Sequence, residues 1–334
     1  MTYAERCKDY TFVGVLSEPM YKYVSERRAF GRLFNKQSQM LARLDKLSFE
    51  FNLHNPELTR ELVEKWCELR PNECRKNQRY RVNFIRRLAE FMVRYGYTAY
   101  VTNVKISTVD DYQFVPYIFT QEELARLFYE IDNMKPSPNL PRAVYIFPVL
   151  YRILYCCGLR ANEALNLLIG DVDIENGVLN IREAKHGKHR YVPMSPEMTA
   201  RCKWLLSAIH KKSSPNDWFF PNARNNKFHI TSAYWYFRRF LEKAEISHGG
   251  KGNGPRMHDL RHTFAVHCLQ KWVSEGANLQ ALFPYLSSYL GHCKLGGTQK
   301  YLHLTTEAHT GLIEQFREYA SDIIPILEAL YEEE

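Results

Sequence analysis

HDLRHTF at residues 258–264 and LGHCKLGGTQKYLH at residues 290–303 are the two strings that decide how this chain is interpreted. The first string predicts a helix and carries His258 and Arg261, three positions apart. On a helix, residues at that spacing share one face, so both side chains can reach a single phosphate group. The second string carries Tyr301. A phenol next to an imidazole and a guanidinium indicates an enzyme that attacks a phosphodiester with its own side chain.

Two further residues complete the predicted set. Arg160 lies in GLRANEAL, after Gly158 and at the start of a predicted helix, where unpaired backbone amides favour an anion. His292 precedes Tyr301 by nine residues, so both can come from neighbouring short helices. A tyrosine nucleophile has an ordinary pKa of about 10 and needs nearby cations to stabilise its phenolate. Two arginines on the nonbridging oxygens would position the phosphate and neutralise charge in the transition state.

A proton donor for the leaving oxygen is expected on a hairpin. Residues 178–181 and 190–192 are predicted to form two short strands, joined by AKHGKH. Lys185 near the tip of this turn is the predicted general acid, and Lys188 is the second choice.

Simpler explanations exist for each residue taken alone. Arg160 could be a surface arginine paired with Glu163 at helical spacing, and His258 could be a core histidine next to an exposed arginine. His258 with His262 and His267 could also form a zinc site. Because an arginine lies between the first two histidines and no HExxH glutamate is present, we expect no metal and no cofactor.

Composition limits the function only broadly. The chain has 334 residues, which suggests two domains, and 45 Lys plus Arg against 37 Asp plus Glu give a net charge of +8. This balance favours a polyanionic partner without requiring one. Eight scattered cysteines without a CxxC pair, no signal-peptide core and no membrane-length apolar run predict a cytoplasmic, nucleoid-associated protein.

The fold is predicted to be mainly α-helical. Residues 1–105 are expected to form a helical DNA-binding domain, 106–116 a linker, and 117–334 a mostly helical domain with a small antiparallel sheet. In the second domain, Thr120 and Glu123 match a helix capping box, and residues 142–157 predict a buried helix ended by glycine. Further helices are expected at about 197–211, 231–245 and 256–275.

The most charged element of the first domain runs from Arg70 to Arg94, where apolar residues interleave with basic ones. One face of such a helix would pack on a core and the other would face solvent. The basic face could lie against DNA phosphates or could be an ordinary solvated surface. The residues predicted to contact DNA are Arg75, Lys76, Arg79, Arg86 and Arg87, together with Lys188 of the hairpin.

At this point the chain resembles a known family, the tyrosine recombinases or phage integrases. The resemblance covers residues 117–305 and extends more loosely over the helical first domain. It rests on GLRANEAL, AKHGKHRYVP, HDLRHTF, LGH and the tyrosine nine residues later, in that order. Any one of these motifs is weak evidence, but five in this order are highly specific.

The resemblance implies a mechanism and an assembly. Tyr301 would attack the scissile phosphate and form a 3′-phosphotyrosyl link, without metal or cofactor, while Arg160 and Arg261 bind the phosphate. His258 and His292 would assist proton handling, with Glu163 and His262 as supports. The family acts as a tetramer on two double-stranded DNA sites with inverted-repeat cores, exchanging strands through a Holliday junction. Sister recombinases or directionality factors are possible partners.

The end of the chain is consistent with such an assembly. Residues 322–331 predict a last helix with an apolar face, formed by Ile323, Ile326, Leu327, Leu330 and Tyr331. Our hypothesis is that it docks into a neighbouring protomer, and the alternative is packing on its own domain.

Two departures from the family pattern guide the choice of biological role. The stretch GANLQALFPYLSSYLGH at residues 276–292 is about one helical turn longer than usual and is more similar to transposon-encoded recombinases than to Xer proteins. The chain before Pro19 is too short for the arm-binding domain of lambda-type integrases. We therefore expect a mobile-element recombinase, with Xer-type resolution as the alternative. A related topoisomerase, or a DNA-binding regulator without catalysis, would use the same surface differently.

Overall fold

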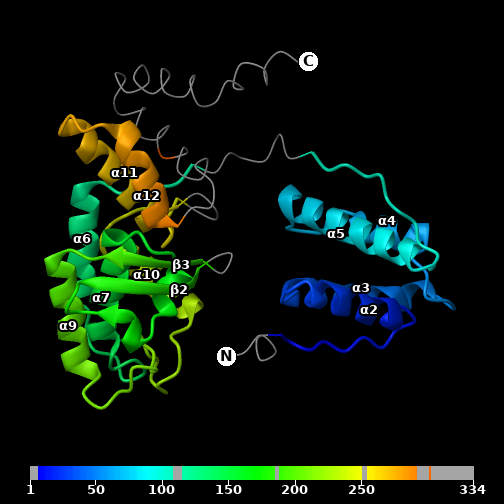
Figure 1. Cartoon of the computed structure of the whole chain (residues 1–334), viewed down its shortest axis with the longest axis horizontal. Coiled ribbons are helices and arrows are strands. Elements are labelled where there is room, and N and C mark those ends of the chain that lie inside the picture. Colours follow the sequence, from blue (N-terminus) through cyan, green and yellow to red (C-terminus); the bar gives the residue numbers. More distant parts are fainter. Residues whose placement is uncertain (1–6, 108–114, 185–187, 250–253, 292–300, 302–334) are drawn as a thin grey trace. The chain divides into compact units, whose positions relative to one another are not determined.

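The computed structural model divides into two compact units, Met1–Phe114 and Val115–Glu334 (Figure 1). The residues that the structure describes are 7–107, 115–184, 188–249, 254–291 and 301. Lys185, His292 and the predicted helix at 322–331 lie outside these residues.

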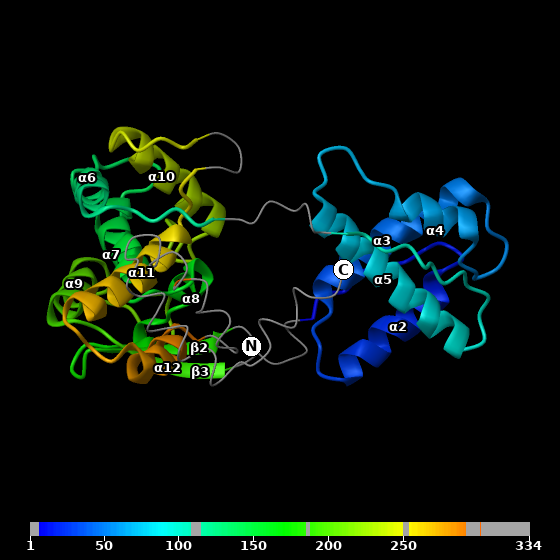
Figure 2. The same ribbon diagram turned by 90° about the horizontal axis from the view of Figure 1, so that it is seen from above.

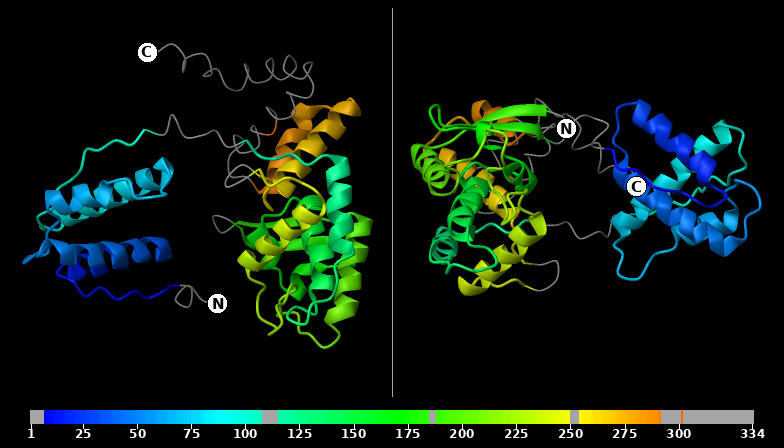
Figure 3. Two further views of the ribbon diagram at one scale, coloured as in Figure 1. Left: turned by 180° about the vertical axis from the view of Figure 1, so that it is seen from behind. Right: turned by 90° about the horizontal axis from the view of Figure 1, so that it is seen from below.

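Unit 1 is a bundle of helices, as the sequence predicts (Figures 1 and 3). Its helix α5 packs against α4 and α2, and α3 packs against both α2 and α4. The shared core is built from apolar residues of every helix, including Met20, Leu44, Leu62 and Leu88. The described helices of this unit are α2 (Ser17–Ala29), α3 (Asn35–Ser48), the 3-10 turn η1 (Phe49–Phe51), α4 (Arg60–Cys67) and α5 (Arg75–Arg94).

Helix α5 is amphipathic, as expected. One of its arginines, Arg81, is buried, although the basic residues of this helix were expected to face solvent. The Arg81 side chain is buried, forms an ion pair of 2.6 Å with Glu73 and donates to the Glu68 carbonyl at 2.7 Å. The Arg81 guanidinium lies over the Trp66 ring, with 5.6 Å between the guanidinium carbon and the ring centroid. Arg81 therefore stabilises the α4–α5 junction and does not contribute to the basic surface.

Unit 2 is mostly helical, with one small sheet (Figure 1). The three helices expected at 197–211, 231–245 and 256–275 are present; the first two each begin one residue and end two residues earlier than expected, and the third begins three residues later and ends one residue earlier. Helix α7 lies at the centre and packs against α6, α9 and α11. The described helices of this unit are α6 (Gln121–Asp132), α7 (Ala143–Cys156), α8 (Ala161–Leu165), η2 (Ile169–Asp171), α9 (Pro196–Ile209), α10 (Ile230–Lys243), α11 (Asp259–Ser274) and α12 (Leu279–Leu290).

Local signals set the ends of two helices as predicted. Thr120 and Glu123 form a reciprocal capping box at the start of α6. Helix α7 is apolar on nearly all sides, and after it Gly158 adopts a left-handed φ of 57°.

A buried tyrosine on α7, Tyr151, donates a hydrogen bond to the Ala233 carbonyl at 2.7 Å and so connects α7 to α10.

The sheet is antiparallel, in the order β1-β2-β3. Strands β2 (Val178–Ala184) and β3 (Lys188–Pro193) form the predicted hairpin and are longer than expected. Strand β1 (Val172–Asp173) was not predicted, because two residues carry no readable alternation. Helix α12 packs against β3, and the two lie side by side in Figure 2.

The glycine after α7 is required by both its conformation and its surroundings. A Cβ atom at Gly158 would come within 2.6 Å of the Phe264 ring and 2.9 Å of Leu290. We predict that Gly158→Ala lowers the free energy of unfolding by about 1–3 kcal/mol from overpacking, in addition to a backbone penalty of about 1 kcal/mol. Urea denaturation of the full chain measures this change.

Gly276 provides the matched control. Its φ is also left-handed, at 65°, but nothing lies within 4 Å of the position of its Cβ. Gly276→Ala should therefore show the backbone penalty alone. If both variants lost the same free energy of unfolding, the close approach of a Cβ atom to Phe264 and Leu290 would not be destabilising.

Candidate active site

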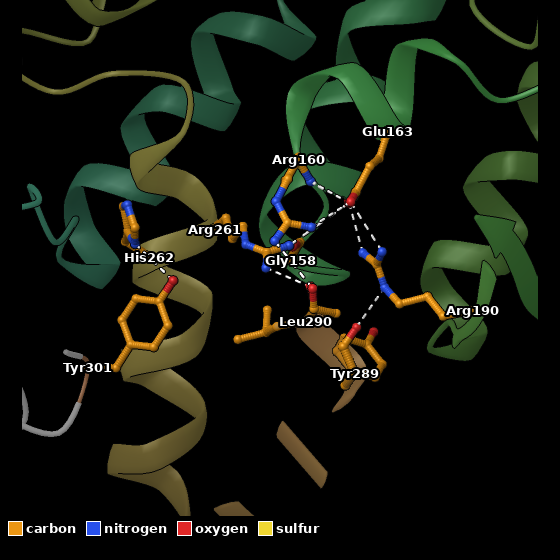
Figure 4. Close-up of polar contacts among 10 residues, drawn as sticks. Gly158, Arg160, Glu163, Arg190, Arg261, His262, Tyr289, Leu290 and Tyr301 are labelled. Atoms are coloured by element: carbon orange, nitrogen blue, oxygen red, sulfur yellow. Dashed lines mark hydrogen bonds and ion pairs between the residues drawn. The ribbon is translucent and has the colours of Figure 1, made fainter. Parts of the chain in front are cut away.

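The Arg261 guanidinium is the buried centre of the site, and its side chain is 1% exposed. It donates to the Gly158 carbonyl at 2.7 Å and to the Leu290 carbonyl at 2.6 Å (Figure 4). These carbonyls stand where α7 and α12 end, and C-terminal carbonyls attract cations. Burial and the charge of Arg160 lower the pKa of Arg261 to about 10, so it stays charged at neutral pH.

A single carboxylate, that of Glu163, organises the surrounding arginines. It accepts from Arg160 at 2.6 Å and from both terminal nitrogens of Arg190 at 3.1 and 2.8 Å (Figure 4). The Arg261 guanidinium lies 3.9 Å away. Burial raises the pKa of Glu163, but the bonds and charges of Arg190 and Arg160 outweigh it and lower that pKa to about 2.

Arg160 precedes the five-residue helix α8 and remains a quarter exposed. Its pairing with Glu163, foreseen as the simpler explanation, is present. The expected role of unpaired helix amides is not supported, because the Glu163 carboxylate itself accepts from the Arg160 amide at 3.0 Å. The guanidinium, which also donates to the Gly291 carbonyl at 3.4 Å, is the group that reaches the pocket.

Tyr301 is nearly buried, with 2% of its surface exposed. Its hydroxyl lies 3.0 Å from Nδ1 of His262, as the dashed line in Figure 4 shows. Burial raises the pKa of Tyr301, and the charge and hydrogen bond of Arg261, followed by the charge of Arg160, act in the opposite direction. The fold thus brings together the predicted nucleophile and both predicted phosphate-binding arginines.

His258 is the residue immediately before α11, one turn before His262, and its side chain makes no capping hydrogen bond. The alternative of a core histidine next to an exposed arginine is wrong, because His258 is exposed and Arg261 is buried. Partial burial, followed by the charges of Arg261, Arg160 and Arg256, lowers the pKa of His258 to about 4. It is therefore neutral at physiological pH.

An open pocket of about 790 Å³ lies next to these groups. Positively charged side chains dominate its charged lining, because Glu163 is set against Arg160, Arg182 and Arg256. His258 also lines it. Such a lining suits a phosphodiester, whose oxygens accept charge-assisted hydrogen bonds.

Three arginines of the site were missed by the sequence analysis. Arg190 lies inside the quoted motif AKHGKHRYVP and joins β3 to Glu163 and, through a 2.9 Å bond, to the Tyr289 carbonyl. Arg256 stands two residues before His258 and pairs with Asp259 at 3.4 Å, and Arg182 on β2 pairs with Asp171. Only Arg190 carried a usable signal, its place in the motif.

Two predicted catalytic residues, Lys185 and His292, lie outside the described residues. Lys188 begins strand β3 next to the hairpin turn. The roles given to these residues stay predictions.

The histidines considered for zinc do not converge on one point. The rings of His258 and His262 are perpendicular, with centroids 4.8 Å apart, while His267 Nδ1 lies 2.9 Å from the Tyr155 hydroxyl. Within the described ranges, no group of three His, Cys, Asp or Glu side chains could hold a metal ion. Among those same ranges, no helix is both apolar and long enough to cross a bilayer.

On α5, the predicted DNA-contacting residues divide into two groups. Arg75, Lys76, Arg79 and Arg87 are exposed. Arg86 instead donates to the Thr102 carbonyl at 2.9 Å, to Asn83 at 2.8 Å and to the Val104 carbonyl at 2.5 Å. The structure gives Arg86 a role within the unit, so the other four form the candidate basic surface.

Sequence comparisons give the chain its relatives. Residues 118–308 match the model of the phage integrase family. A protein of Sinorhizobium fredii with the name integrase/recombinase y4rE is 30% identical over 87% of this chain and 92% of its own length. Tyrosine recombinase XerC of Oceanobacillus iheyensis is 28% identical over 70% of this chain and 72% of its own length.

Solved structures share the fold. The XerH site-specific recombinase bound to its difH substrate in a post-cleavage complex gives a TM-score of 0.61 at 20% identity, covering 86% of this chain and 80% of that one. The Tn1549 transposon integrase with a circular intermediate DNA gives a TM-score of 0.59 at 17% identity, covering 88% of this chain and 99% of that one.

The carboxylate at the centre of the arginine cluster should make stability depend on pH. Glu163 has an ordinary pKa of 4.5 in the unfolded chain and about 2 in the fold. Its contribution is therefore complete above pH 4.5 and is lost as the pH falls toward 2. We predict that Glu163→Gln lowers the free energy of unfolding by about 3 kcal/mol at neutral pH, and that the difference from wild type shrinks across this window.

Denaturation of both proteins from pH 7 downward measures this difference. Glu64→Gln is the control, because Glu64 pairs with Arg60 on an exposed helix face and should contribute under about 1 kcal/mol. A difference between wild type and Glu163→Gln that did not change with pH would contradict the prediction.

Proposed function

The chain belongs to the phage integrase family, and from this premise we propose that it is a site-specific DNA recombinase that cuts and rejoins DNA through a phosphotyrosyl intermediate. One observation carries the proposal. The Tyr301 hydroxyl lies in a site where Arg261 and Arg160 both counter the rise in its pKa. This is the arrangement that a tyrosine needs in order to attack a phosphate.

In the proposed reaction, the Tyr301 oxygen attacks the scissile phosphorus and the 5′ oxygen leaves. Arg160 and Arg261 bind the nonbridging oxygens and stabilise the charge that develops there. Lys185 protonates the leaving oxygen, and His258 and His292 assist binding of the transition state. A later attack by a 5′ hydroxyl on the phosphotyrosine rejoins a strand, so bond energy is conserved and no external energy source is required.

Double-stranded DNA with inverted-repeat core sites is the proposed substrate. XerH and the Tn1549 integrase are both described in complexes with their DNA. In this chain, the net charge of +8 and the exposed side chains of Arg75, Lys76, Arg79 and Arg87 support binding to phosphates. The proposed assembly is a homotetramer on two sites that exchanges strands through a Holliday junction, with sister recombinases or directionality factors as possible partners.

The proposed biological role is recombination of a mobile element. Helix α12 occupies most of the stretch that is longer than the usual family spacing, and the transposon integrase shares the fold over most of this chain. Xer-type resolution of chromosome or plasmid dimers is the second candidate, favoured by the likeness to XerC.

Covalent trapping tests the chemistry. We expect wild-type protein, mixed with nicked duplexes from the borders of its own gene, to form protein–DNA adducts that survive denaturation. The nick lets a short fragment leave, which strands the phosphotyrosine. Tyr301→Phe should bind DNA normally and form no adduct, and sequencing the trapped DNA should give a shared inverted repeat.

Tyr285→Phe is the matched control, because Tyr285 is 72% exposed on α12. It should form adducts at the wild-type rate. Adducts that persist in Tyr301→Phe would refute the assignment of the nucleophile, and binding without adducts in the wild type would favour a regulator.

The basic surface of α5 makes a separate prediction. If Lys76 and Arg79 both contact phosphates, their joint replacement by Gln should reduce the slope of log K against log salt by roughly 0.9 per contact. Affinity should fall about equally for specific and unrelated sequences, because phosphate contacts do not read bases. Equilibrium binding at several salt concentrations measures both effects.

Arg60 and Lys65 on α4 provide a control with the same change in charge. Both are exposed and pair with neighbouring glutamates. Their replacement by Gln should leave the salt slope nearly unchanged. Equal changes in the two double variants would mean that net charge, and not the α5 surface, determines binding.

A further inference from the structure

His262 contacts the hydroxyl of the proposed nucleophile, Tyr301, but has no step of its own in the proposed reaction. Its Nδ1 lies 3.0 Å from the Tyr301 hydroxyl, and the two rings are tilted by 52° with centroids 5.4 Å apart (Figure 4). Tyr301 is almost fully buried. The phenolic proton therefore has a partner inside the protein before any DNA arrives.

The attacking phenol must lose that proton, and its surroundings limit where the proton can go. Arg261 also hydrogen-bonds the hydroxyl, but a guanidinium only donates and cannot accept. An imidazole with hydrogen on Nε2 has a lone pair on Nδ1 and can accept. Because the pKa of Tyr301 is raised by burial, spontaneous ionisation at neutral pH is rare, and an acceptor in contact is needed.

His258 is less suited to this task. Partial burial and three arginines hold its pKa near 4, so it takes up a proton with difficulty. It also stands one turn away, with its ring centroid 4.8 Å from that of His262. His262 lies directly against the hydroxyl.

We propose that His262 is a catalytic residue that accepts the phenolic proton of Tyr301 as the oxygen attacks phosphorus. This inference rests on the proposed recombinase function. The Tyr301 O–H bond breaks, the proton goes to Nδ1, and the phenolic oxygen forms its bond to phosphorus. The bond from phosphorus to the 5′ oxygen breaks, and that oxygen takes a proton from the general acid. In strand joining, His262 returns its proton to the departing phenolate.

The charged and titratable groups around His262 come from three elements. The His258 ring, just before α11, meets the His262 ring, and the Tyr301 hydroxyl lies against Nδ1 of His262. Arg261 of α11 and Arg160, just before α8, both act on that hydroxyl. A phosphodiester bound by the arginines would offset their positive charge and so make an imidazolium next to them less unfavourable.

The test compares wild type with His262→Asn in single-turnover formation of the covalent adduct. The Asn carbonyl oxygen can accept a hydrogen bond near the position of Nδ1 but cannot hold the proton. We expect the rate at neutral pH to fall by about 10²–10⁴-fold with DNA binding unchanged. The variant's rate should then rise about tenfold per pH unit, as hydroxide ionises the phenol, while the wild-type rate levels off.

A sulfur leaving group separates the two proton transfers. When the 5′ bridging oxygen of the substrate is replaced by sulfur, the thiolate leaves without protonation. The defect of His262→Asn should persist on this substrate, and that of Lys185→Met should be relieved. If sulfur relieved the His262→Asn defect, His262 would act on the leaving group and the proposal would be overturned.

His267→Asn is the matched control, because this histidine lies on the same helix and its Nδ1 also contacts a tyrosine hydroxyl, that of Tyr155, at 2.9 Å. It should keep the wild-type rate and pH profile. A His262→Asn enzyme with the wild-type rate, or with an equal loss at every pH, would show that His262 only positions Tyr301. Absence of adducts in wild type would instead overturn the recombinase function itself.

Discussion

One buried cation, the Arg261 guanidinium, sets the arrangement around it. A charge with 1% exposure is costly to desolvate unless it is hydrogen-bonded and paired. Here the carbonyls of Gly158 and Leu290 and the carboxylate of Glu163 compensate it. Helices α7, α11 and α12 and the short helix α8 must therefore meet at one point for the fold to be stable.

The same arrangement makes the site ready to bind an anion. Arg160, Arg190 and Arg261 lie around one carboxylate, so positive charge exceeds negative charge before any ligand binds. Burial, followed by the charges of Arg261, Arg160 and Arg256, lowers the pKa of His258, and the charges of Arg261 and Arg160 counter the effect of burial on the pKa of Tyr301. A phosphate bound there would complete the charge balance, which links stability of the free protein to recognition of its substrate.

The interpretation of single residues illustrates what a pattern can predict. The ion pair between Arg160 and Glu163 had been considered as an alternative to phosphate binding by Arg160. In the structure Arg160 forms this ion pair and also lines the pocket, so the two explanations do not exclude each other. Arg86 was grouped with the DNA-contacting residues because charge and helical spacing cannot tell a solvent-exposed arginine from one bonded to backbone carbonyls. Strand β1 escaped notice because two residues are too few to show a period.

The amino-acid sequence by itself determined the helical class, the hairpin, the α6 capping box and the family, because these depend on local periodicity and on motifs of fixed spacing. Only the tertiary structure decided which side chains share a carboxylate, which arginines are buried and which histidine meets Tyr301. Those outcomes depend on contacts between segments far apart in the chain, such as Arg190 with Glu163 or Arg261 with Gly158. Burial and hydrogen bonding across such distances arise only when the helices pack, so no local pattern encodes them.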